Sequence, residues 1–164
     1  IAAKDAVRHW LWERGVAEVF PAEITIGNDE SGRPFAEGPF DDDLRLSIAH
    51  TEWLGVARVD VGRPVGIDVE RVEPRGDRFS DVALDEVEAA DAAGSADPDL
   101  ALTRLWAVKE AVAKARGTGL EGRPRDFPVR AAEGGTFVVG DQTVSTETLD
   151  ADQEARHVVA WTTP

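Results

Sequence analysis

The sequence predicts a mixed fold of helices and strands, and three observations lead to this prediction. The chain has 164 residues, which suits one domain or two small halves that share a core. Residues 100–116 carry apolar side chains at the spacing of a long helix. Short apolar runs with the length of strands lie both before and after this helix.

The amino-terminal part predicts one helix and one short strand. Residues 4–19 have a loose apolar stripe at helical spacing, and Pro21 breaks the pattern. Residues 24–26 (ITI) have the composition of a short strand. Residues 28–34 (NDESGRP) contain the asparagine, glycine and proline that are typical of a turn.

The middle of the chain predicts three strands and one acidic helix. The strands are expected at residues 44–48, 53–59 and 65–69, where β-branched and aromatic residues are frequent. Residues 79–91 contain many acidic side chains and predict a helix.

The last part predicts the most regular helix and four short strands. Leucine, tryptophan, valine and alanine give residues 100–116 an apolar side, and Gly117 follows where a helix-ending glycine is expected. The strands are expected at residues 127–131, 136–139, 143–148 and 156–161.

The charge and the lack of cysteine exclude several classes of function. Without cysteine there are no disulfides, thiol nucleophiles or thiolate metal sites. A net charge of −14 disfavours nucleic acids and anionic membranes as partners, because like charges repel. No apolar run approaches the roughly 20 residues that span a membrane, and we expect a cytoplasmic protein. The chain begins at Ile1 and lacks methionine, so we expect it to be part of a longer polypeptide.

The residues that carry chemistry lie in two segments. The chain has 15 arginines and 3 lysines, yet Lys109 and Lys114 lie in one helix beside Glu110, which indicates a need for a compact positive charge. Residues i and i+4 share a helix face, so Glu110 aligns with Lys114. Residues i and i+2 share a strand face, so Asp68 aligns with Glu70. If the strand and the helix pack together, three carboxylates converge, and a hard cation such as Mg²⁺ would relieve their repulsion.

Each of these patterns also has a purely structural interpretation. The polar face of a half-buried strand shows the same alternation of acidic residues. A Glu–Lys pair at i,i+4 is a common surface ion pair that contributes only about 0.2–0.5 kcal/mol. A lone histidine such as His50 is more often structural than functional. The spacing alone therefore leaves both interpretations open.

The order of five segments, however, resembles a known family, the 4′-phosphopantetheinyl transferase superfamily, in its surfactin-synthetase-activating type. The resemblance covers roughly residues 4–161. It rests on these segments, in this order: Gly32-Arg33-Pro34-Phe35, Ser47-Ile48-Ala49-His50-Thr51, Gly66-Ile67-Asp68-Val69-Glu70, Trp106-Ala107-Val108-Lys109-Glu110-Ala111-Val112-Ala113-Lys114 and Gly117-Thr118-Gly119-Leu120.

The resemblance implies a fold and an activity. The fold would be α+β, a single domain over residues 1–164 built as a pseudo-dimer of two similar halves. Residues 1–65 would form a short or truncated first half, and residues 66–164 a second half with the metal site. The enzyme would transfer the 4′-phosphopantetheine arm of coenzyme A to a serine of an acyl or peptidyl carrier protein, as a holo-[acyl-carrier-protein] synthase does. Adenosine 3′,5′-bisphosphate would be released.

The resemblance also implies roles for individual residues. Asp68 and Glu110 would bind Mg²⁺ directly, and Glu70 would be a third ligand, directly or through a water. Lys114 would stabilise the pyrophosphate and the departing phosphate. Glu110, or a water that it orients, would accept the serine proton. Lys109 is rotated by about 100° from Glu110 on the helix, and is a secondary candidate for phosphate binding.

Two further residues would contact coenzyme A. His50 matches a histidine that contacts a phosphate of coenzyme A, and Arg33 matches a basic residue near its 3′-phosphate. The family usually has asparagine and then serine before this histidine, and here Ser47 and Ala49 occupy those places. Basic residues that would precede the first helix are absent.

Other interpretations remain open at this stage. The chain could be a catalytically silent copy of the fold that serves as a docking domain in a megasynthase, or a different Mg²⁺ hydrolase. If it is a transferase built into a megasynthase, its carrier protein would lie in the same polypeptide. Arg116, Arg123 and Arg125 follow the helix and could form a basic patch for an acidic carrier.

Overall fold

The fold of the chain is α+β. The computed structural model describes residues 1–16, 18–41, 43–76, 78–151 and 155–163. The helices are α1 (Ala2–Glu13), α2 (Phe79–Ala83), α3 (Glu86–Ala93) and α4 (Pro98–Arg116), and the short 3-10 helices are η1 (Pro21–Glu23), η2 (Pro124–Asp126) and η3 (Glu133–Gly135). The strands are β1 (Thr25–Asn28), β2 (Pro34–Glu37), β3 (Leu44–His50), β4 (Gly55–Val61), β5 (Ile67–Arg71), β6 (Arg130–Ala131), β7 (Thr136–Val139), β8 (Gln142–Ala151) and β9 (Ala155–Thr163).

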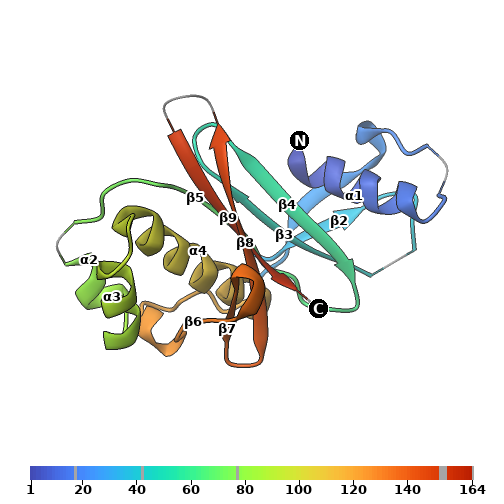
Figure 1. Cartoon of the computed structure of the whole chain (residues 1–164). Coiled ribbons are helices and arrows are strands. Elements are labelled where there is room, and N and C mark those ends of the chain that lie inside the picture. The colour runs from blue at the N-terminus through green and yellow to red at the C-terminus, as the bar shows by residue number, and fades with distance from the viewer. Residues whose placement is uncertain (17, 42, 77, 152–154, 164) are drawn as a thin grey trace.

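The amino-terminal part consists of α1 and two hairpins. Strands β1 and β2 pair with each other, β3 pairs with β4, and both pairings are antiparallel. Helix α1 lies against the β3–β4 hairpin, on the right of the view in Figure 1. Its apolar stripe buries Val7 and Leu11 against Ile24 and Leu44. This small core holds the hairpins in place.

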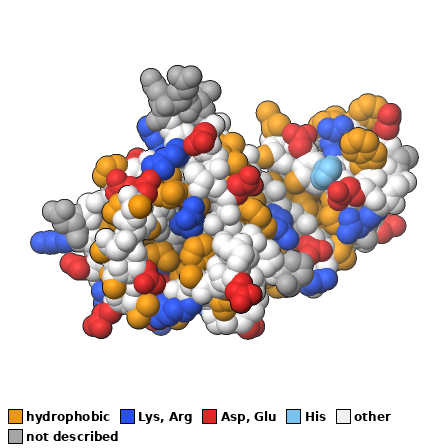
Figure 2. Space-filling model, viewed as in Figure 1, with side chains coloured by type: hydrophobic (Ala, Val, Ile, Leu, Met, Phe, Trp, Pro, Cys, Tyr) orange, Lys and Arg blue, Asp and Glu red, His pale blue; other side chains and the backbone are white. Residues whose placement is uncertain are grey.

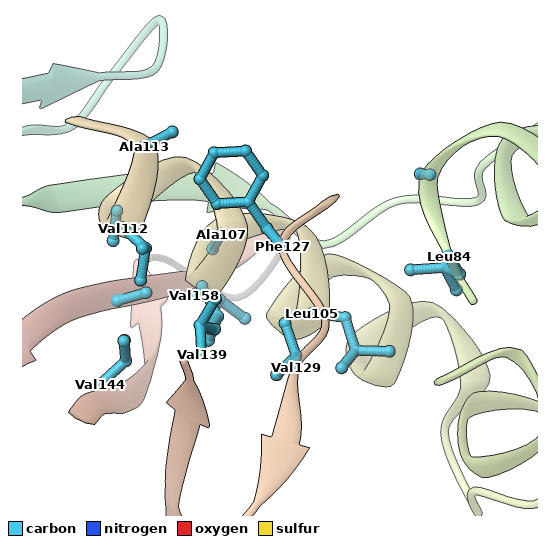
Figure 3. Packing of buried hydrophobic residues seen from close by; sticks show 14 of the residues in the cluster. Leu84, Leu105, Ala107, Val112, Ala113, Phe127, Val129, Val139, Val144 and Val158 are labelled. Atoms are coloured by element: carbon cyan, nitrogen blue, oxygen red, sulfur yellow. The ribbon is translucent and has the colours of Figure 1, made fainter. Parts of the chain in front are cut away.

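The carboxy-terminal part is a five-stranded antiparallel sheet covered by α4. The strand order is β5-β9-β8-β7-β6. Figure 3 shows the ring of Phe127 beside Ala107 of α4, and Val144 and Val158 of the sheet belong to the same buried cluster. Helix α3 packs against the opposite side of α4, so that α4 is buried along most of its length.

The two parts meet between β3 and β5. Among the described residues, no strand before residue 66 pairs with a strand after it. The backbone N–H of Ile67 instead donates to the Ser47 hydroxyl at 3.0 Å, and Ala49 packs against Ile67 and Val69. The predicted boundary near Gly66 falls between β4 and β5. That the two parts are similar halves of a pseudo-dimer stays a prediction.

Helix α4 and strand β5 approach each other more closely than side chains would normally allow. A Cβ on Gly66 would overlap the carbonyl oxygen of Ala111 and crowd the backbone N of Ala115. Glycine at 66 and alanines on the facing side of α4 therefore let the two backbones come together. The residues that follow Gly66 on β5 are thereby brought next to the second half of α4.

Several element predictions need correction. Helix α1 ends at Glu13 and not at residue 19, because Gly15 turns the chain with a φ of +72°. The helix predicted at 79–91 is two helices, because the Asp85 side chain accepts the N–H groups of Val87 and Glu88 and begins a new helix. Strand β2 was not predicted. Of the strand predicted at 127–131, only residues 130–131 are extended and paired.

None of the helices described has the length and apolar composition that crossing a membrane requires.

Candidate active site

The candidate site lies where β5 faces α4. On β5, Ile67 and Val69 point to one side and pack with Ala49, whereas Asp68 and Glu70 alternate with them and face the helix. Lys114 on α4 donates its Nζ to Oδ1 of Asp68 at 2.7 Å. The structure thus brings strand and helix together as the sequence suggested.

Asp68 is the most buried acidic group of the site. It is 5% exposed, and its Oδ2 atom is buried without a hydrogen-bond partner among the described residues. Burial raises the pKa of this carboxyl, while the ammonium of Lys114 opposes the rise. Lys114 uses one oxygen of Asp68, and the other, Oδ2, keeps its capacity as an acceptor among the described residues.

Glu110 lies one helical turn before Lys114 and is half-buried. Burial raises the pKa of Glu110, and the negative charges of Asp68 and Glu70 raise it further. The charge of Lys114 acts in the opposite direction. The three carboxylates are therefore close enough to disfavour one another's ionised forms.

Glu70 is held by two residues for which no role was predicted. The indole N–H of Trp106 donates to Oε1 at 3.2 Å, and a guanidinium N–H of Arg75 donates to Oε2 at 2.9 Å. The Trp106 ring meets Phe79 edge-on, with centroids 5.4 Å apart, and Arg75 lies over the same Phe79 ring. No sequence pattern marks Arg75, whereas Trp106 lies within the helix motif.

The site fits a hard cation that takes few protein ligands. No three His, Cys, Asp or Glu side chains in the described parts of the chain gather closely enough to hold a metal by themselves. Mg²⁺ usually takes one or two carboxylates and completes its shell with water and phosphate oxygens. The unpaired Oδ2 of Asp68 and the carboxylate of Glu110 would supply two such ligands. Glu70, whose oxygens are both engaged, stays a predicted ligand only.

Lys109 does not have the predicted phosphate-binding role in this structure. Its side chain is fully buried, and its Nζ donates to the carboxylate of Glu88 and to the carbonyl oxygens of Pro124 and Phe127, all at 2.8–3.0 Å. These contacts use the three N–H donors of the ammonium. Glu88 also accepts the N–H of Val129, so the pair joins α4 to α3 and to the 124–129 segment.

A cleft of about 650 Å³ opens next to Lys114. It runs between the amino-terminal part and the end of α4, and its walls include Arg33, Arg45, Ser47 and Gly117. Arg33 donates to the carbonyl oxygen of Arg116 at 2.7 Å and lies flat against Gly117, where any Cβ would overlap the guanidinium. Asp29 and Asp43 also line the cleft, and Arg45 is paired with Asp43, so the cleft has an excess of one positive charge. Lys114 lies in its wall, where it can meet an anionic group of a ligand.

His50 lies apart from these contacts. It is the last residue of β3, it pairs with Gly55, and its side chain is exposed. No hydrogen bond or ion pair within the described ranges joins it to Arg33, Lys114 or the carboxylates. Its contact with a coenzyme A phosphate stays a prediction.

A comparison with known protein families identifies the family of the chain. The model of the 4′-phosphopantetheinyl transferase superfamily matches residues 64–162, which include β5 and α4 and more than half of the chain. No curated protein matches the sequence.

Two solved structures show similar chain traces. The holo-[acyl-carrier-protein] synthase of Neisseria meningitidis is 20% identical with a TM-score of 0.46, over 62% of this chain and 98% of that chain. That of Thermotoga maritima is 25% identical with a TM-score of 0.47, over 60% of this chain and 62% of that chain.

Proposed function

Because the chain belongs to the 4′-phosphopantetheinyl transferase superfamily, we propose that it transfers the phosphopantetheine arm of coenzyme A to a serine of an acyl or peptidyl carrier protein. The observation that carries this proposal is the pair of Lys114 and Asp68 beside Glu110, next to a cleft that Arg33 and Lys114 line. A ligand with a pyrophosphate in the cleft would place negative charge next to Lys114. The donor set is all oxygen, which suits a Mg²⁺-dependent reaction.

The reaction exchanges one phosphorus–oxygen bond for another. The serine oxygen of the carrier attacks the β-phosphorus of coenzyme A and forms a new P–O bond. The bond from that phosphorus to the bridging oxygen breaks, and adenosine 3′,5′-bisphosphate leaves with the electron pair. Catalysis of such a step depends mainly on positioning and on stabilising phosphate charge.

Lys114 acts on the phosphate side of this step. Its side chain is 30% exposed, and one of its donors is held by Asp68, which fixes the direction of the ammonium. The remaining N–H donors are available to phosphate oxygens in the cleft. Asp68 thus positions Lys114, and Lys114 stabilises the charge that develops on the leaving phosphate.

Glu110 acts on the serine side. A serine hydroxyl is a weak nucleophile and needs a base within hydrogen-bond reach. The raised pKa of Glu110 makes its carboxylate a better proton acceptor than an exposed glutamate. The proton passes to a carboxylate oxygen of Glu110, or to a water that this oxygen orients. Asp68 and Glu110 would also hold Mg²⁺, which when bound would neutralise charge on the phosphate oxygens.

Four finer parts of the proposal rest on the sequence alone. Arg33 and His50 would contact phosphates of coenzyme A. The chain would be of the surfactin-synthetase-activating type, and its carrier could lie in the same megasynthase polypeptide. The reaction would take place in the cytoplasm.

The test is direct transfer to a carrier. The protein is incubated with coenzyme A, Mg²⁺ and several apo carrier proteins, and the carriers are weighed by mass spectrometry. We expect the phosphopantetheine mass shift with at least one carrier. Its absence with all of them would favour a catalytically silent docking domain with the same fold.

Two substitutions test the residue roles. Glu110→Gln and Lys114→Ala should each abolish transfer while leaving the circular dichroism spectrum unchanged. Lys4→Ala, which removes a lysine on α1 that donates to the Pro21 carbonyl, is the control and should transfer at the normal rate. Full activity of Glu110→Gln would show that the assignment of base and metal ligand is wrong.

A further inference from the structure

Glu70 shares a strand face with Asp68, but its carboxylate is held by other residues. Oε1 accepts the indole N–H of Trp106 at 3.2 Å, and Oε2 accepts a guanidinium N–H of Arg75 at 2.9 Å. We call Arg75 and Trp106, with the Phe79 ring against which both lie, the Glu70 clamp. Both oxygens through which Glu70 could bind a cation are therefore engaged, and the charge of Arg75 repels a cation beside one of them.

The ion pair of the clamp is sheltered from water. The side chains of Arg75 and Glu70 are only 16% and 28% exposed, so salt screens their attraction less than it screens an exposed pair. Glu70 is the only hydrogen-bond acceptor of Arg75 among the described residues, and the Nε atom of Arg75 is buried without a partner. If Glu70 turned toward a cation, it would leave a partly buried guanidinium without an anion, which is costly.

Glu70 nevertheless lies close to the two carboxylates that would hold the cation. Burial raises the pKa of Asp68 and of Glu110, and the charge of Glu70 adds to the rise in both. Within the part of the chain that the structure describes, however, no three acidic, histidine or cysteine side chains gather closely enough to hold a metal. The clamp therefore keeps Glu70 near the site but outside the set of ligands.

The number of carboxylates in such a site affects which cation it prefers. Mg²⁺ usually takes one or two carboxylates and keeps several waters, whereas Ca²⁺ takes about six to eight oxygen ligands in a more flexible shell. A third carboxylate would therefore favour Ca²⁺ more than Mg²⁺.

We propose that Arg75 and Trp106 are positioning residues that keep Glu70 out of the coordination shell and so make the site prefer Mg²⁺ to Ca²⁺. This role rests on the proposed function, because it requires that Asp68 and Glu110 hold a divalent cation. Glu70 then anchors Arg75 and is not the third metal ligand that the sequence resemblance implies.

The experiment measures cation binding without coenzyme A or a carrier. Mg²⁺ and Ca²⁺ are titrated separately into the protein by isothermal titration calorimetry, for the wild type and for Arg75→Met. Methionine keeps an apolar side chain against Phe79 but cannot hold Glu70. We expect Arg75→Met to bind Mg²⁺ roughly tenfold more tightly, because the freed Glu70 joins the ligands, and to gain more affinity for Ca²⁺ than for Mg²⁺.

Two further variants separate this explanation from simpler ones. Arg71→Met removes an exposed positive charge from the same strand, on the face opposite Glu70, and controls for the change in net charge. It should change the affinity for either cation less than about threefold, since exposed charges are screened. Arg75→Met combined with Glu70→Gln removes both partners, and should return both affinities to within about threefold of the wild type. A general disturbance of the fold by Arg75→Met would not be reversed in this way.

Trp106→Phe tests the clamp from its other side. It removes the indole N–H that Oε1 of Glu70 accepts, and it keeps a ring against Phe79. We expect the same direction of change as in Arg75→Met, with a smaller gain in affinity. Circular dichroism monitors the folding of every variant, and Trp106→Phe takes the place of Arg75→Met if the latter does not fold.

Equal Mg²⁺ affinity in Arg75→Met and Arg71→Met, or in Trp106→Phe and the wild type where Arg75→Met does not fold, would overturn the proposal. So would a loss of roughly tenfold or more in the double variant, because Glu70 would then be a ligand in the wild type. A protein that shows the expected affinities but transfers nothing to any carrier would keep this role and fail the proposed activity. If neither cation binds to the wild type or to any variant, both the metal site and this role are wrong.

Discussion

At Glu110 the surroundings act against the ionised side chain, and this has a measurable effect on stability. Burial and the charge of Asp68 raise the pKa of Glu110 above its ordinary value of 4.5. Between the ordinary and the raised pKa, the folded protein binds more protons than the unfolded chain. Stability therefore falls as the pH rises through the raised pKa of Glu110, and this loss persists at neutral pH.

Glu110→Gln should remove this loss. With divalent metals chelated, we expect the variant to gain stability relative to the wild type as the pH rises from about 4 to neutral. Urea unfolding at several pH values measures the difference. Glu30→Gln, which removes an exposed carboxylate from the turn before β2, controls for the change in net charge. A constant difference between Glu110→Gln and wild type over this range would contradict the explanation.

Lys109 gives a second prediction at the residue scale. Its ion pair with Glu88 has no exposed side-chain surface. Lys109→Met would leave the Glu88 carboxylate buried without a cation, and should cost about 3–5 kcal/mol of unfolding free energy. Adding Glu88→Gln removes the stranded charge and should recover part of the loss. Urea unfolding of the single and double variants measures both effects, and a double variant less stable than Lys109→Met would contradict this account.

The sequence predicted some residues of the site and not others, for a physical reason. The strand and helix periods correctly placed Asp68, Glu110 and Lys114 on facing surfaces. The helix period does not show which segments cover the other side of the helix. Lys109 was therefore predicted as a candidate for phosphate binding, whereas in the structure α3 and the 124–129 segment enclose its side chain. Arg75 reaches Glu70 through tertiary packing alone, without any local pattern.

At the scale of elements, the contact between β5 and α4 decides the geometry of the site. Gly66→Ala would place a Cβ far closer to the Ala111 carbonyl oxygen than van der Waals contact allows, and close to the backbone N of Ala115. Because both neighbours are backbone, one element must shift, and we expect a loss of about 1–3 kcal/mol or more. Transfer activity should fall by more than the loss of folded protein explains, since Asp68 moves relative to Glu110.

A matched control exists in the same chain. At Gly76 an added methyl group would have no heavy atom within 4 Å, and the backbone there is not left-handed, so Gly76→Ala should be nearly neutral. Urea unfolding and the transfer rate are measured for both variants. Equal effects of the two substitutions would show that the close approach at Gly66 does not matter.

Elements with local signals were predicted better than elements fixed by partners. Helix α4 has an Asp97 side chain that caps its start and Gly117 in the left-handed conformation at its end, and its predicted bounds were nearly correct. Strand β2 has no apolar run of its own and is extended because β1 pairs with it. The break between α2 and α3 depends on Asp85, which caps the start of α3. Because Asp85 is one of many acidic residues in this segment, the sequence does not single it out as a cap.

At the scale of the molecule, the net charge predicts how an acidic carrier would meet the protein. On the face shown in Figure 2, acidic and basic side chains are interspersed, and neither sign forms a continuous patch. Of the arginines expected to form a basic patch, Arg123 is paired with Glu121 and Asp126, and Arg125 donates to the Asp81 carbonyl. Arg116 and Arg125 form no ion pair among the described residues, so this patch offsets only a small part of the net charge of −14.

We expect kcat/KM for an acidic carrier to rise as salt increases from low ionic strength to about 0.15 M, where the Debye length is about 8 Å. Initial rates at saturating coenzyme A measure this, and a carrier with its acidic residues neutralised is the control. A rate that falls with added salt would mean that a local basic surface outweighs the net charge.

The two parts of the chain are joined by the hydrogen bond from Ile67 to Ser47 and not by strand pairing, so the chain could be cut into two fragments between them. Every strand pairing described closes within residues 25–61 or within residues 67–163, and the connection between them is a short turn at 62–66. Cutting the backbone in that turn would break no β-ladder. The two fragments would then have to recognise each other through one hydroxyl, the small apolar cluster around Ala49 and the Arg33 contact to α4. Mixing separately produced fragments would therefore measure the strength of this interface as an ordinary binding constant, in a protein whose covalent chain normally hides it.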